Sequence, residues 1–329
     1  MSKSLPRISA IITAYNSEAF LKDAINSILC QTLQPAEIVL IDDGSTDDTY
    51  KIAQSYANVG LQYFRQDNQG EGAARNRGIR ETEGEWIAFL DADDIWSEDK
   101  LQRQIEFVRS HPEIGMVGGN KLWWDVEKNT QLLVKYGQVP AKYITKELIV
   151  KNIVGDPSLM LIRRTLFEQA GLFRTDLRIG VDLEMWLRIA KYTSIGFIDA
   201  SLVTYRWHKS NVSHRYMDRR IKTMESISLN AINSYENPMT RIELYFRVKS
   251  NSQFELTFDA MREDISRTKQ LKHALIAFLL FPFEDSGKKA RLILRSLLGA
   301  RLYLVLKSKF QSAEEMEEKQ YGMESKSLK

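Results

Sequence analysis

The 329-residue sequence contains one cysteine, seven prolines and almost no net charge. The single cysteine, Cys30, excludes an intramolecular disulfide framework and a cysteine-based zinc site, and it suits the reducing cytoplasm. Seven prolines and 17 glycines are too few for collagen or for Pro/Gly-rich low-complexity sequence. Because 46 basic residues are balanced by 43 acidic ones, the overall charge gives no reason to expect a nucleic-acid partner.

Long hydrophobic runs are also missing. A membrane-spanning helix needs roughly 18–20 apolar residues, and the longest candidate, Ala274–Phe283, is about half that length and contains Pro282. The N-terminal segment MSKSLPRISAIITAYNSE has too short an apolar run for a signal peptide and lacks a cleavage site of small residues. We therefore expect a cytoplasmic protein without a spanning helix.

Hydrophobic residues make up 43% of the sequence, which is enough for a folded core, and their pattern alternates between strand and helix. Short β-branched runs such as RISAIIT, EIVLID and WIAFL predict buried strands. The predicted strands are Arg7–Thr13, Glu37–Asp42, Leu61–Arg65, Trp86–Leu90, Ile114–Val117, Leu159–Arg163, Gly196–Asp199 and Leu202–Trp207. The predicted helices are Ser17–Thr32, Ser45–Ala57, Gly72–Glu83, Trp96–Ser110, Thr165–Ala170 and Asp182–Tyr192.

Repeated strand–helix units with nearly all-apolar strands predict an α/β fold with a mostly parallel, Rossmann-like sheet covered by helices on both faces. Beyond about residue 215 the sequence is polar, charged and helix-rich, with scarcely a strand signal. We therefore predict two domains, an α/β domain over residues 1–215 and a helical C-terminal extension over residues 216–329.

Acidic residues follow two of the predicted strands directly. Asp42 and Asp43 close EIVLID, and Asp91 and Asp93 follow WIAFL with one residue between them. Ligands of parallel sheets bind beyond the carboxyl ends of the strands, which is where these carboxylates lie. Paired carboxylates suit Mg²⁺ or Mn²⁺ bound to a diphosphate, and Asp43 can accept a hydrogen bond from uracil or a ribose hydroxyl. The alternative for both clusters is that they only cap the following helices.

A glycine-rich segment, GEGAAR, follows the third predicted strand. It is not a dinucleotide-binding turn, because that motif follows the first strand and needs a glycine where this sequence has Arg75. The sequence contains no P-loop motif either, which argues against a P-loop NTPase. Near the start of a helix, Arg75 can instead offer its cation to a phosphate or to the carboxylates.

Taken in order, these segments resemble one family. ISAIITAYNSEAFLKDAINSILCQT, EIVLIDDGSTDDT and NQGEGAARNRGIRETEGEWIAFLDADD are similar to the N-terminal half of family 2 glycosyltransferases, which have the GT-A fold. The resemblance continues at DLEMWLRIAKY and VTYRWHKSNVSH, and it covers roughly residues 6–214. It implies a catalytic domain that moves a sugar from a nucleotide diphosphate, usually UDP, to a hydroxyl acceptor. Inversion at the anomeric carbon, a Mn²⁺ or Mg²⁺ cofactor and a role in cell-surface glycan synthesis are also implied.

The resemblance further implies roles for individual residues of the donor site. Asp91 and Asp93 match the DxD motif of the family, with Asp93 the stronger metal candidate. His208 can complete the metal shell or contact phosphate, and the alternative is a surface imidazole. The residues implied to bind the nucleotide are Thr13, Ala14, Tyr15, Asp43, Arg75 and Asp91.

For the acceptor side, Asp182 matches the general base, which is the second residue of a Glu-Asp pair in the family. This sequence has Val181 where the glutamate is usual. The alternative for Asp182 is a helix cap. Three functions therefore stay open: a glycosyltransferase with a glycan or lipid-linked acceptor, a metal-dependent nucleotidyltransferase, and a non-catalytic module that binds nucleotide sugars.

Basic residues gather near the C-terminus around apolar ones. The short apolar run Ala274–Phe283 precedes an apolar stripe at helical spacing, which comprises Leu294, Leu297, Leu298, Leu302 and Val305. An apolar helix face with basic flanks can lie among lipid headgroups. We expect residues 271–310 to lie peripherally on an anionic inner membrane surface. The alternative is packing on the catalytic domain or on a second subunit in a homodimer.

Overall fold

The computed structural model describes residues 5–137, 144–211, 217–262 and 266–281, together with 289, 290, 293 and 296. The chain divides into two compact units, Met1–Ser234 and a second one that begins at Tyr235. The functional division between residues 215 and 216 stays a prediction, since it rests on sequence pattern and not on compactness.

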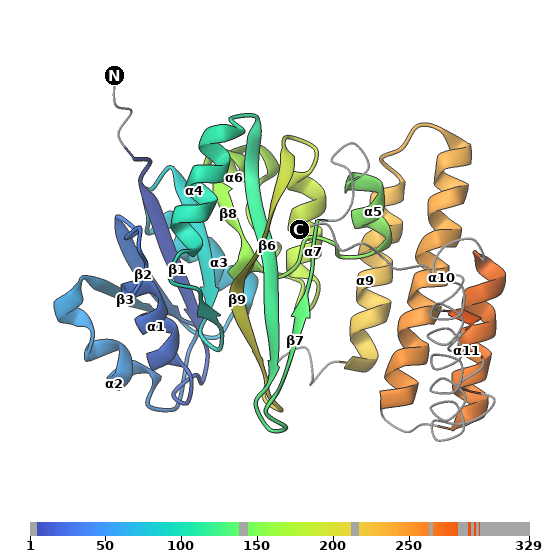
Figure 1. The fold of residues 1–329 in the computed structure, drawn as a ribbon, viewed down its shortest axis with the longest axis horizontal. Helices are drawn as coiled ribbons and strands as arrows, with labels where there is room; N and C mark the ends of the chain where they lie inside the picture. The colour runs from blue at the N-terminus through green and yellow to red at the C-terminus, as the bar shows by residue number, and fades with distance from the viewer. Residues whose placement is uncertain are drawn as a thin grey trace, which may run out of the picture. The chain divides into compact units, whose positions relative to one another are not determined.

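In the described part of the chain, the first unit contains a single nine-stranded sheet (Figure 1). Its strands are β1 (Ile8–Ala14), β2 (Glu37–Asp42), β3 (Leu61–Arg65), β4 (Trp86–Asp91), β5 (Ile95–Trp96), β6 (Ile114–Asp125), β7 (Thr130–Val134), β8 (Leu161–Arg163) and β9 (Ser194–Trp207). Their order is β3-β2-β1-β4-β8-β6-β9-β5, with β7 paired to β6. Strands β3, β2, β1 and β4 run parallel, β8 is antiparallel to both neighbours, and β6 and β9 are parallel. The predicted mostly parallel sheet is confirmed.

Helices cover the sheet of the first unit (Figure 1). They are α1 (Leu21–Leu29), α2 (Thr49–Gln54), α3 (Glu71–Arg80), α4 (Lys100–Ser110), α5 (Ile144–Val150), α6 (Thr165–Ala170), α7 (Val181–Ile189) and α9 (Met217–Ile232), with short 3₁₀ turns at η1 (Ala57–Val59) and η3 (Pro157–Leu159). The central strands are fully enclosed, since Ile11, Leu40 and Phe89 have 0% of their surface exposed. Full enclosure on both faces explains why these strands read as continuous apolar runs.

Three helices begin later than their sequence pattern predicted. Helix α2 begins at Thr49 rather than Ser45, because Ser45 N–H donates to Asp42 Oδ1 (2.8 Å) and keeps the chain in a turn. Helix α1 begins at Leu21 rather than Ser17. The segment before α4 forms the two-residue strand β5 instead of helix. In each case local polar contacts or sheet pairing compete with the helical pattern.

Strands β6 and β9 are longer than predicted. The two strands predicted at Gly196–Asp199 and Leu202–Trp207 are one bulged strand, β9, which runs beside β6 to its end. Strand β6 continues beyond the predicted end at Val117, because Gly118 and Gly119 have low strand propensity and interrupt the sequence pattern. They are needed for packing: a Cβ at Gly118 would lie 2.5 Å from Met160 Cε, and one at Gly119 would lie 2.6 Å from Leu202 Cδ1.

The second unit contains α10 (Pro238–Arg262) and α11 (Arg267–Leu280), so the predicted helical extension is confirmed. Ala274 and Ala277 of α11 are buried against Phe254 of α10. Ser250 Oγ donates to the carbonyl oxygen of Ala277 (2.7 Å). No helix among the described residues is long and apolar enough to cross a membrane. The apolar stripe predicted over 294–305 lies outside the described residues.

Candidate active site

The carboxyl ends of β1, β2 and β4 lie side by side and bring the acidic residues together. Thr13 of β1 pairs in register with Ile41 of β2 and with Asp91 of β4. Asp91 Oδ1 accepts hydrogen bonds from Arg75 Nη2 (2.7 Å) and Thr13 Oγ1 (3.1 Å). The first predicted carboxylate is therefore held by a cation from α3 and by a hydroxyl from the neighbouring strand.

Arg75 is the buried cation of the site, with 2% of its side chain exposed. Its Nη1 lies 3.2 Å from Glu71 Oε2, one turn earlier on α3, while Nη2 binds Asp91. Phe173 lies 5.8 Å from the guanidinium carbon. Despite burial, the nearby carboxylates of Asp91 and Glu71 raise the pKa of Arg75 above its ordinary value. The guanidinium is a permanent positive charge at the end of β4.

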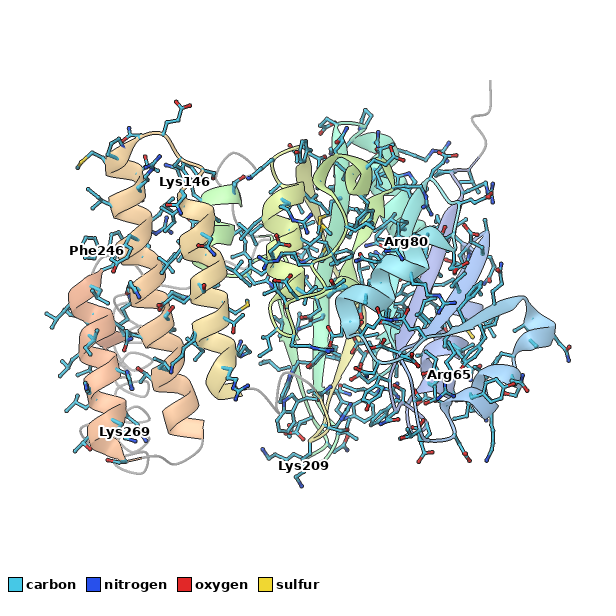
Figure 2. All side chains as sticks on the ribbon, turned by 180° about the vertical axis from the view of Figure 1, so that it is seen from behind. Arg65, Arg80, Lys146, Lys209, Phe246 and Lys269 are labelled. Atoms are coloured by element: carbon cyan, nitrogen blue, oxygen red, sulfur yellow. The ribbon has the colours of Figure 1, made fainter. Side chains whose placement is uncertain are left out.

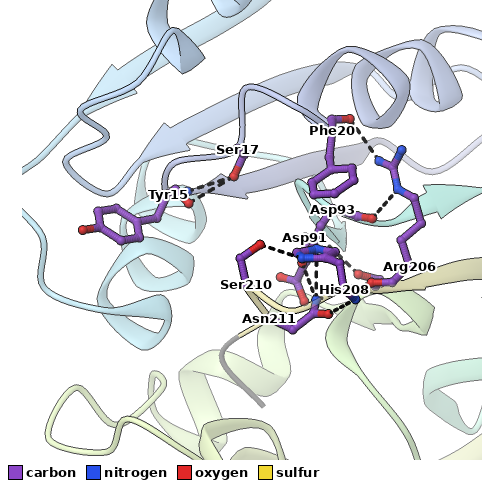
Figure 3. Close-up of polar contacts among 10 residues, drawn as sticks. Tyr15, Ser17, Phe20, Asp91, Asp93, Arg206, His208, Ser210 and Asn211 are labelled. Atoms are coloured by element: carbon purple, nitrogen blue, oxygen red, sulfur yellow. Dashed lines mark hydrogen bonds and ion pairs between the residues drawn. The ribbon is translucent and has the colours of Figure 1, made fainter. Parts of the chain in front are cut away.

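Asp93 is held from the opposite direction by residues that follow β9 (Figure 3). Its Oδ2 accepts a 2.8 Å hydrogen bond from Asn211 Nδ2 and lies 3.2 Å from His208 Nε2. The other ring nitrogen of His208 contacts Ser210 Oγ at 2.7 Å, and the ring stacks on Phe20 with centroids 4.3 Å apart. The histidine is thus an oriented side chain of the site and not a free surface imidazole.

Arg206 connects the turn that carries Asp93 to the start of α1. Only 3% of its side chain is exposed, and its three nitrogens donate to the Asp93 carbonyl oxygen (2.6 Å), Asp23 Oδ2 (2.6 Å) and the Phe20 carbonyl oxygen (3.0 Å). A planar guanidinium can satisfy three acceptors in fixed directions, which a lysine could not. Arg206 therefore fixes the backbone of the Asp91–Asp93 turn relative to α1 (Figure 3).

Asp94 is the buried member of the acidic cluster, with 1% of its surface exposed. Its Oδ1 has no hydrogen-bond partner among the described residues. Burial, and then the charges of Asp93 and Asp91, raise the pKa of Asp94 well above its ordinary value. Asp94 is therefore a buried carboxyl next in the chain to Asp91 and Asp93, which carry the contacts of the site.

Asp43 follows β2 and organises the loop before α3. Its Oδ1 accepts from Gln66 Nε2 (2.7 Å) and Gln69 N–H (2.9 Å), and its Oδ2 accepts from Gly70 N–H (2.7 Å). Gly70 has φ +94°, a conformation that favours glycine. Asp43 is buried, with 4% of its surface exposed, and its contacts are with this loop. Its predicted role in binding the uracil of a nucleotide stays a prediction.

The remaining predicted nucleotide residues lie at the end of β1. Ala14 is buried at 3% exposure, and Tyr15 is 47% exposed. Tyr15 N–H donates to Ser17 Oγ at 3.2 Å, in a tight turn visible in Figure 3. The exposed phenol ring beside a buried alanine offers an open surface at this edge of the sheet.

Asp182 lies at the second residue of α7. Its Oδ2 accepts a 3.1 Å hydrogen bond from Asn152 Nδ2. Burial raises the pKa of Asp182, and the charge of Asp156 acts in the same direction, while the Leu183 N–H and Arg75 act against it.

Helices α3 and α7 meet at a glycine. A Cβ at Gly72 would lie 2.5 Å from the Arg174 carbonyl oxygen and 3.3 Å from Val181 Cγ1. Val181 is 3% exposed. Its apolar side chain packs against Gly72, at the position where a glutamate is usual in the family. The next residue along α7 is Asp182, and Arg75 lies on the next turn of α3.

Glu71 adds a further carboxylate at this junction. Desolvation raises its pKa to about 7, and the charges of Asp91, Asp182 and Asp93 push in the same direction against Arg75. Its side chain is 47% exposed, so solvent moderates this effect. Sequence reasoning passed over Glu71 because it was part of a segment judged only as a glycine-rich turn.

The donor set at Asp93 fits a divalent cation. Asp93 Oδ2 and His208 Nε2 are 3.2 Å apart, so one ion can be ligated by both, and carboxylate oxygen with imidazole nitrogen suits Mn²⁺. Asp91 Oδ1 is already bonded to Arg75. No group of three or more metal-binding side chains occurs in the part of the chain that the structure describes. Ligands from a diphosphate and water would have to complete the shell.

Residues 9–171 match the family model described as Glycosyl transferase family 2. The chain belongs to glycosyl transferase family 2. An uncharacterized glycosyltransferase of Rickettsia conorii is 33% identical over 231 residues, which are 70% of this chain and 37% of that protein. TuaG of Bacillus subtilis, named for teichuronic acid biosynthesis, is 29% identical over 65% of this chain and 84% of its own length. The chain thus spans well under half of the Rickettsia relative.

Two solved structures share the architecture of this chain. S. aureus TarS in complex with UDP-GlcNAc has a TM-score of 0.60 at 17% identity, covering 89% of this chain and 92% of that chain. Mannosyltransferase PcManGT from Pyrobaculum calidifontis, in complex with GDP-Man and Mn²⁺, has a TM-score of 0.58 at 18% identity, covering 89% and 86%. At such identities the likeness concerns the fold, and the predicted GT-A fold is confirmed.

Sequence reasoning missed the residues that support this family 2 site. They are Ser158, whose Oγ accepts from Asp91 N–H (3.0 Å), together with Asn152, Arg206 and Asn211. Asn211 begins a glycosylation-type tripeptide, and that pattern hid its role as a donor to Asp93. A buried arginine inside a strand, Arg206, was the one available signal, because such a charge needs partners.

Proposed function

We propose that this chain is an inverting glycosyltransferase that moves a sugar from a UDP-linked donor to a hydroxyl group of an acceptor glycan. Asp182 is the general base, and Asp91 and Asp93 bind the metal–diphosphate. One observation carries the proposal. An acidic pair ends β4 between a buried cation, Arg75, and an oriented imidazole, His208.

The charge of the site supports a cation-dependent donor. The charges of Asp91 and Asp93 act on the carboxylate of Glu71, and together the three carboxylates would repel a diphosphate unless positive charge lies between them. Arg75 supplies part of that charge. A Mn²⁺ or Mg²⁺ ion at Asp93 and His208 would neutralise the charge that develops on the leaving diphosphate.

The acceptor chemistry rests on Asp182. The carboxylate must lie within about 2.6–3.2 Å of the acceptor hydroxyl to take its proton. A raised pKa makes the ionised form of Asp182 a stronger proton acceptor. Attack from this side, opposite the departing diphosphate, gives inversion at the anomeric carbon.

The choice of donor and pathway is drawn from similar proteins. TarS has been solved with UDP and with UDP-GlcNAc, and TuaG is named for the synthesis of a cell-wall polysaccharide. We extend these properties to this chain as a UDP-sugar donor and an acceptor in cell-surface glycan synthesis. A lipid-linked acceptor would place the enzyme at the cytoplasmic face of the inner membrane, bound peripherally through its C-terminal helices, with a homodimer as the alternative use of those helices.

The test uses the full chain with UDP-glucose, UDP-galactose, UDP-GlcNAc and GDP-mannose, each with Mn²⁺, with Mg²⁺ or with EDTA. We expect one UDP-sugar to raise the melting temperature in the presence of metal and to release UDP slowly by hydrolysis. Binding without any release of UDP would favour a non-catalytic module, and release of pyrophosphate would favour a nucleotidyltransferase. The absence of stabilisation by every nucleotide sugar would contradict the proposal.

A further inference from the structure

The segment between α5 and η3 holds one oxygen of Asp182 in a fixed direction. Asn152 Oδ1 accepts hydrogen bonds from Val154 N–H (3.2 Å) and Gly155 N–H (3.0 Å). An amide whose oxygen accepts two backbone N–H groups must point its NH₂ group the other way. That group, Nδ2, donates to Asp182 Oδ2 at 3.1 Å. The orientation of the Asn152 amide is therefore imposed by its own turn.

The same segment is attached to α7 a second time. The carbonyl oxygen of Gly155 accepts a 3.0 Å hydrogen bond from Trp186 Nε1, and Trp186 is 0% exposed. Trp186 lies four residues after Asp182, so the two bonds join adjacent turns of one helix face. Gly155 has φ +98°, and a Cβ there would lie 2.8 Å from Leu159 Cδ1 and 3.0 Å from Tyr136 Cζ, so only glycine fits this turn.

An ion pair with a buried lysine connects the far end of the segment to the sheet. Lys121 of β6 is 8% exposed and donates to Asp156, and its ammonium lies 4.4 Å from the centre of the Tyr205 ring. Asn152–Asp156 is thus held by the sheet on one side and by α7 on the other. Three separate contacts over five residues make it a rigid support.

We propose that Asn152 is a positioning residue that aims the Asp182 carboxylate at the acceptor hydroxyl, with the Asn152–Asp156 segment as its support. The inference rests on the proposed function, in which Asp182 is the general base. Asn152 touches no reacting atom. Among the described residues, its amide NH₂ group donates to Asp182 Oδ2, which orients the carboxylate and favours its ionised form.

Other charged groups also act on Asp182. Arg75 and Glu71 face it from α3, Asp156 from the supporting segment, and Tyr136 from the end of β7. Arg75 favours the ionised form of Asp182, whereas Asp156 opposes it. Loss of the Asn152 donor therefore shifts the balance toward the protonated form, because the opposing acidic charges remain.

The decisive variant is Asn152→Asp. An aspartate at this position can still accept from both backbone N–H groups, so the turn is kept, but it places a second carboxylate against Asp182 and removes the donor. Asn152→Ala removes both functions. Asn129→Asp, on the exposed turn between β6 and β7, makes the same chemical change away from the site and serves as the control.

Two measurements test the proposal. The first is a carboxyl ¹³C NMR titration of the full chain labelled at aspartate, with Asp182 assigned from the signal lost in Asp182→Asn. We expect Asp182 in Asn152→Asp to titrate at least about one pH unit higher than in the parent or in Asn129→Asp. The second is the pH profile of UDP release, whose acid limb is expected to move upward by the same amount. UDP–Mn²⁺ affinity stays within about twofold of the parent.

Unchanged titration and an unchanged acid limb in Asn152→Asp would overturn the positioning role. A shifted titration with an unchanged acid limb would overturn it too, since the contact would then not matter to turnover. If Asp182→Asn turned over the donor as fast as the parent, the proposed base itself would be wrong. If Asp182→Asn were inactive while Asn152→Asp matched Asn129→Asp, only the role of Asn152 would fail.

Discussion

His208 Nε2 lies 3.2 Å from Asp93 Oδ2, although 115 residues separate the two in the chain. Asn211 Nδ2 bonds to the same oxygen at 2.8 Å. One oxygen of the Asp93 carboxylate therefore contacts both an imidazole and an amide from the segment that follows β9. An ion at this oxygen would take the imidazole as its second protein ligand.

Asp93→Ala is expected to abolish the metal-dependent binding of UDP, because it removes the carboxylate that His208 and Asn211 orient. Asp91→Ala is expected to have a smaller effect, since Asp91 is bonded mainly to Arg75 and Thr13. Isothermal titration calorimetry with Mn²⁺ and with EDTA measures both. Equal UDP affinity with metal and with chelator in the parent protein would rule out the metal role.

Asp182→Asn is expected to lower the rate of sugar transfer by roughly 10²–10⁴-fold, the usual contribution of a general base. Nucleotide-sugar binding should change little, because the amide keeps the size of the carboxylate. Single-turnover measurements of transfer, paired with calorimetry, separate the two effects. Transfer within tenfold of the parent would show that another group takes the proton.

Glu71→Gln is expected to stabilise the metal-free protein at pH 8 and to lose this advantage on acidification. The pKa of Glu71 is raised to about 7 in the folded state from an ordinary value of 4.5. The folded protein therefore binds this proton more tightly than the unfolded chain, and stability falls as pH rises from about 4.5 to 7. A glutamine at position 71 carries no negative charge at pH 8, so it avoids the cost of burying an ionised carboxylate there.

Melting temperatures between pH 5 and 8 in EDTA test this prediction. Glu81→Gln is the matched control, since Glu81 lies just after α3 and pairs with Arg77 at 3.4 Å. A difference between Glu71→Gln and the parent that stays constant with pH would contradict the assignment.

Arg206→Met is expected to destabilise the protein by about 3 kcal/mol, because it leaves buried acceptors at Asp93 and Phe20 without their charged donor. Lys209→Met is the control, since Lys209 makes an exposed ion pair with Glu127, of a kind that contributes about 0–1 kcal/mol. Urea denaturation of both variants gives the free energies. Similar losses in the two would mean that Arg206 is not the support of this corner.

The second unit is expected to bind anionic vesicles through apolar side chains that its own core leaves exposed. Leu275 and Leu279 of α11 are 41% and 76% exposed, and Phe246 of α10 is 41% exposed. Lys269 on α11 is exposed as well, and Figure 2 labels it together with Phe246. Exposed apolar side chains and exposed lysines on the same helices suit an anionic lipid surface.

Flotation with anionic and with neutral liposomes compares the full chain with the Leu275→Ser, Leu279→Ser double variant. Both sites are exposed, so the core formed by Ala274, Ala277 and Phe254 is kept. We expect the double variant to lose most of its binding to anionic vesicles at low salt. Equal flotation of the two proteins would exclude a role for this surface.

The sequence was most informative where burial alone decides structure. The strands Glu37–Asp42 and Leu61–Arg65 were predicted to the residue, because a short β-branched run between turns has few other solutions. The acidic ends of β2 and β4 followed from strand direction. What periodicity could not supply was the pairing of distant segments. Asn152 beside Asp182, and Asn211 beside Asp93, come from loops whose polar residues also fit an ordinary surface.

The hydrophobic pattern also failed to predict structure where glycines or close packing between helices determine it. Gly118 and Gly119 interrupt the strand signal of β6, although close packing on Met160 and Leu202 requires them. From the sequence alone, Val181 indicates only that the glutamate usual in the family is missing. In the structure, Val181 is buried and packs against Gly72 of α3.

Gly72 sets how closely α3 approaches α7 and the segment that precedes it. With no side chain there, the backbone of Arg174 and the methyl group of Val181 come within contact distance of α3. Because Asp182 follows Val181 and Arg75 lies one turn after Gly72, the separation of the Asp182 carboxylate and the Arg75 guanidinium depends on the missing methyl group at Gly72. A shift of α7 would therefore change the distance between the general base and the diphosphate-binding cation that we propose, so these two proposed functions are mechanically coupled.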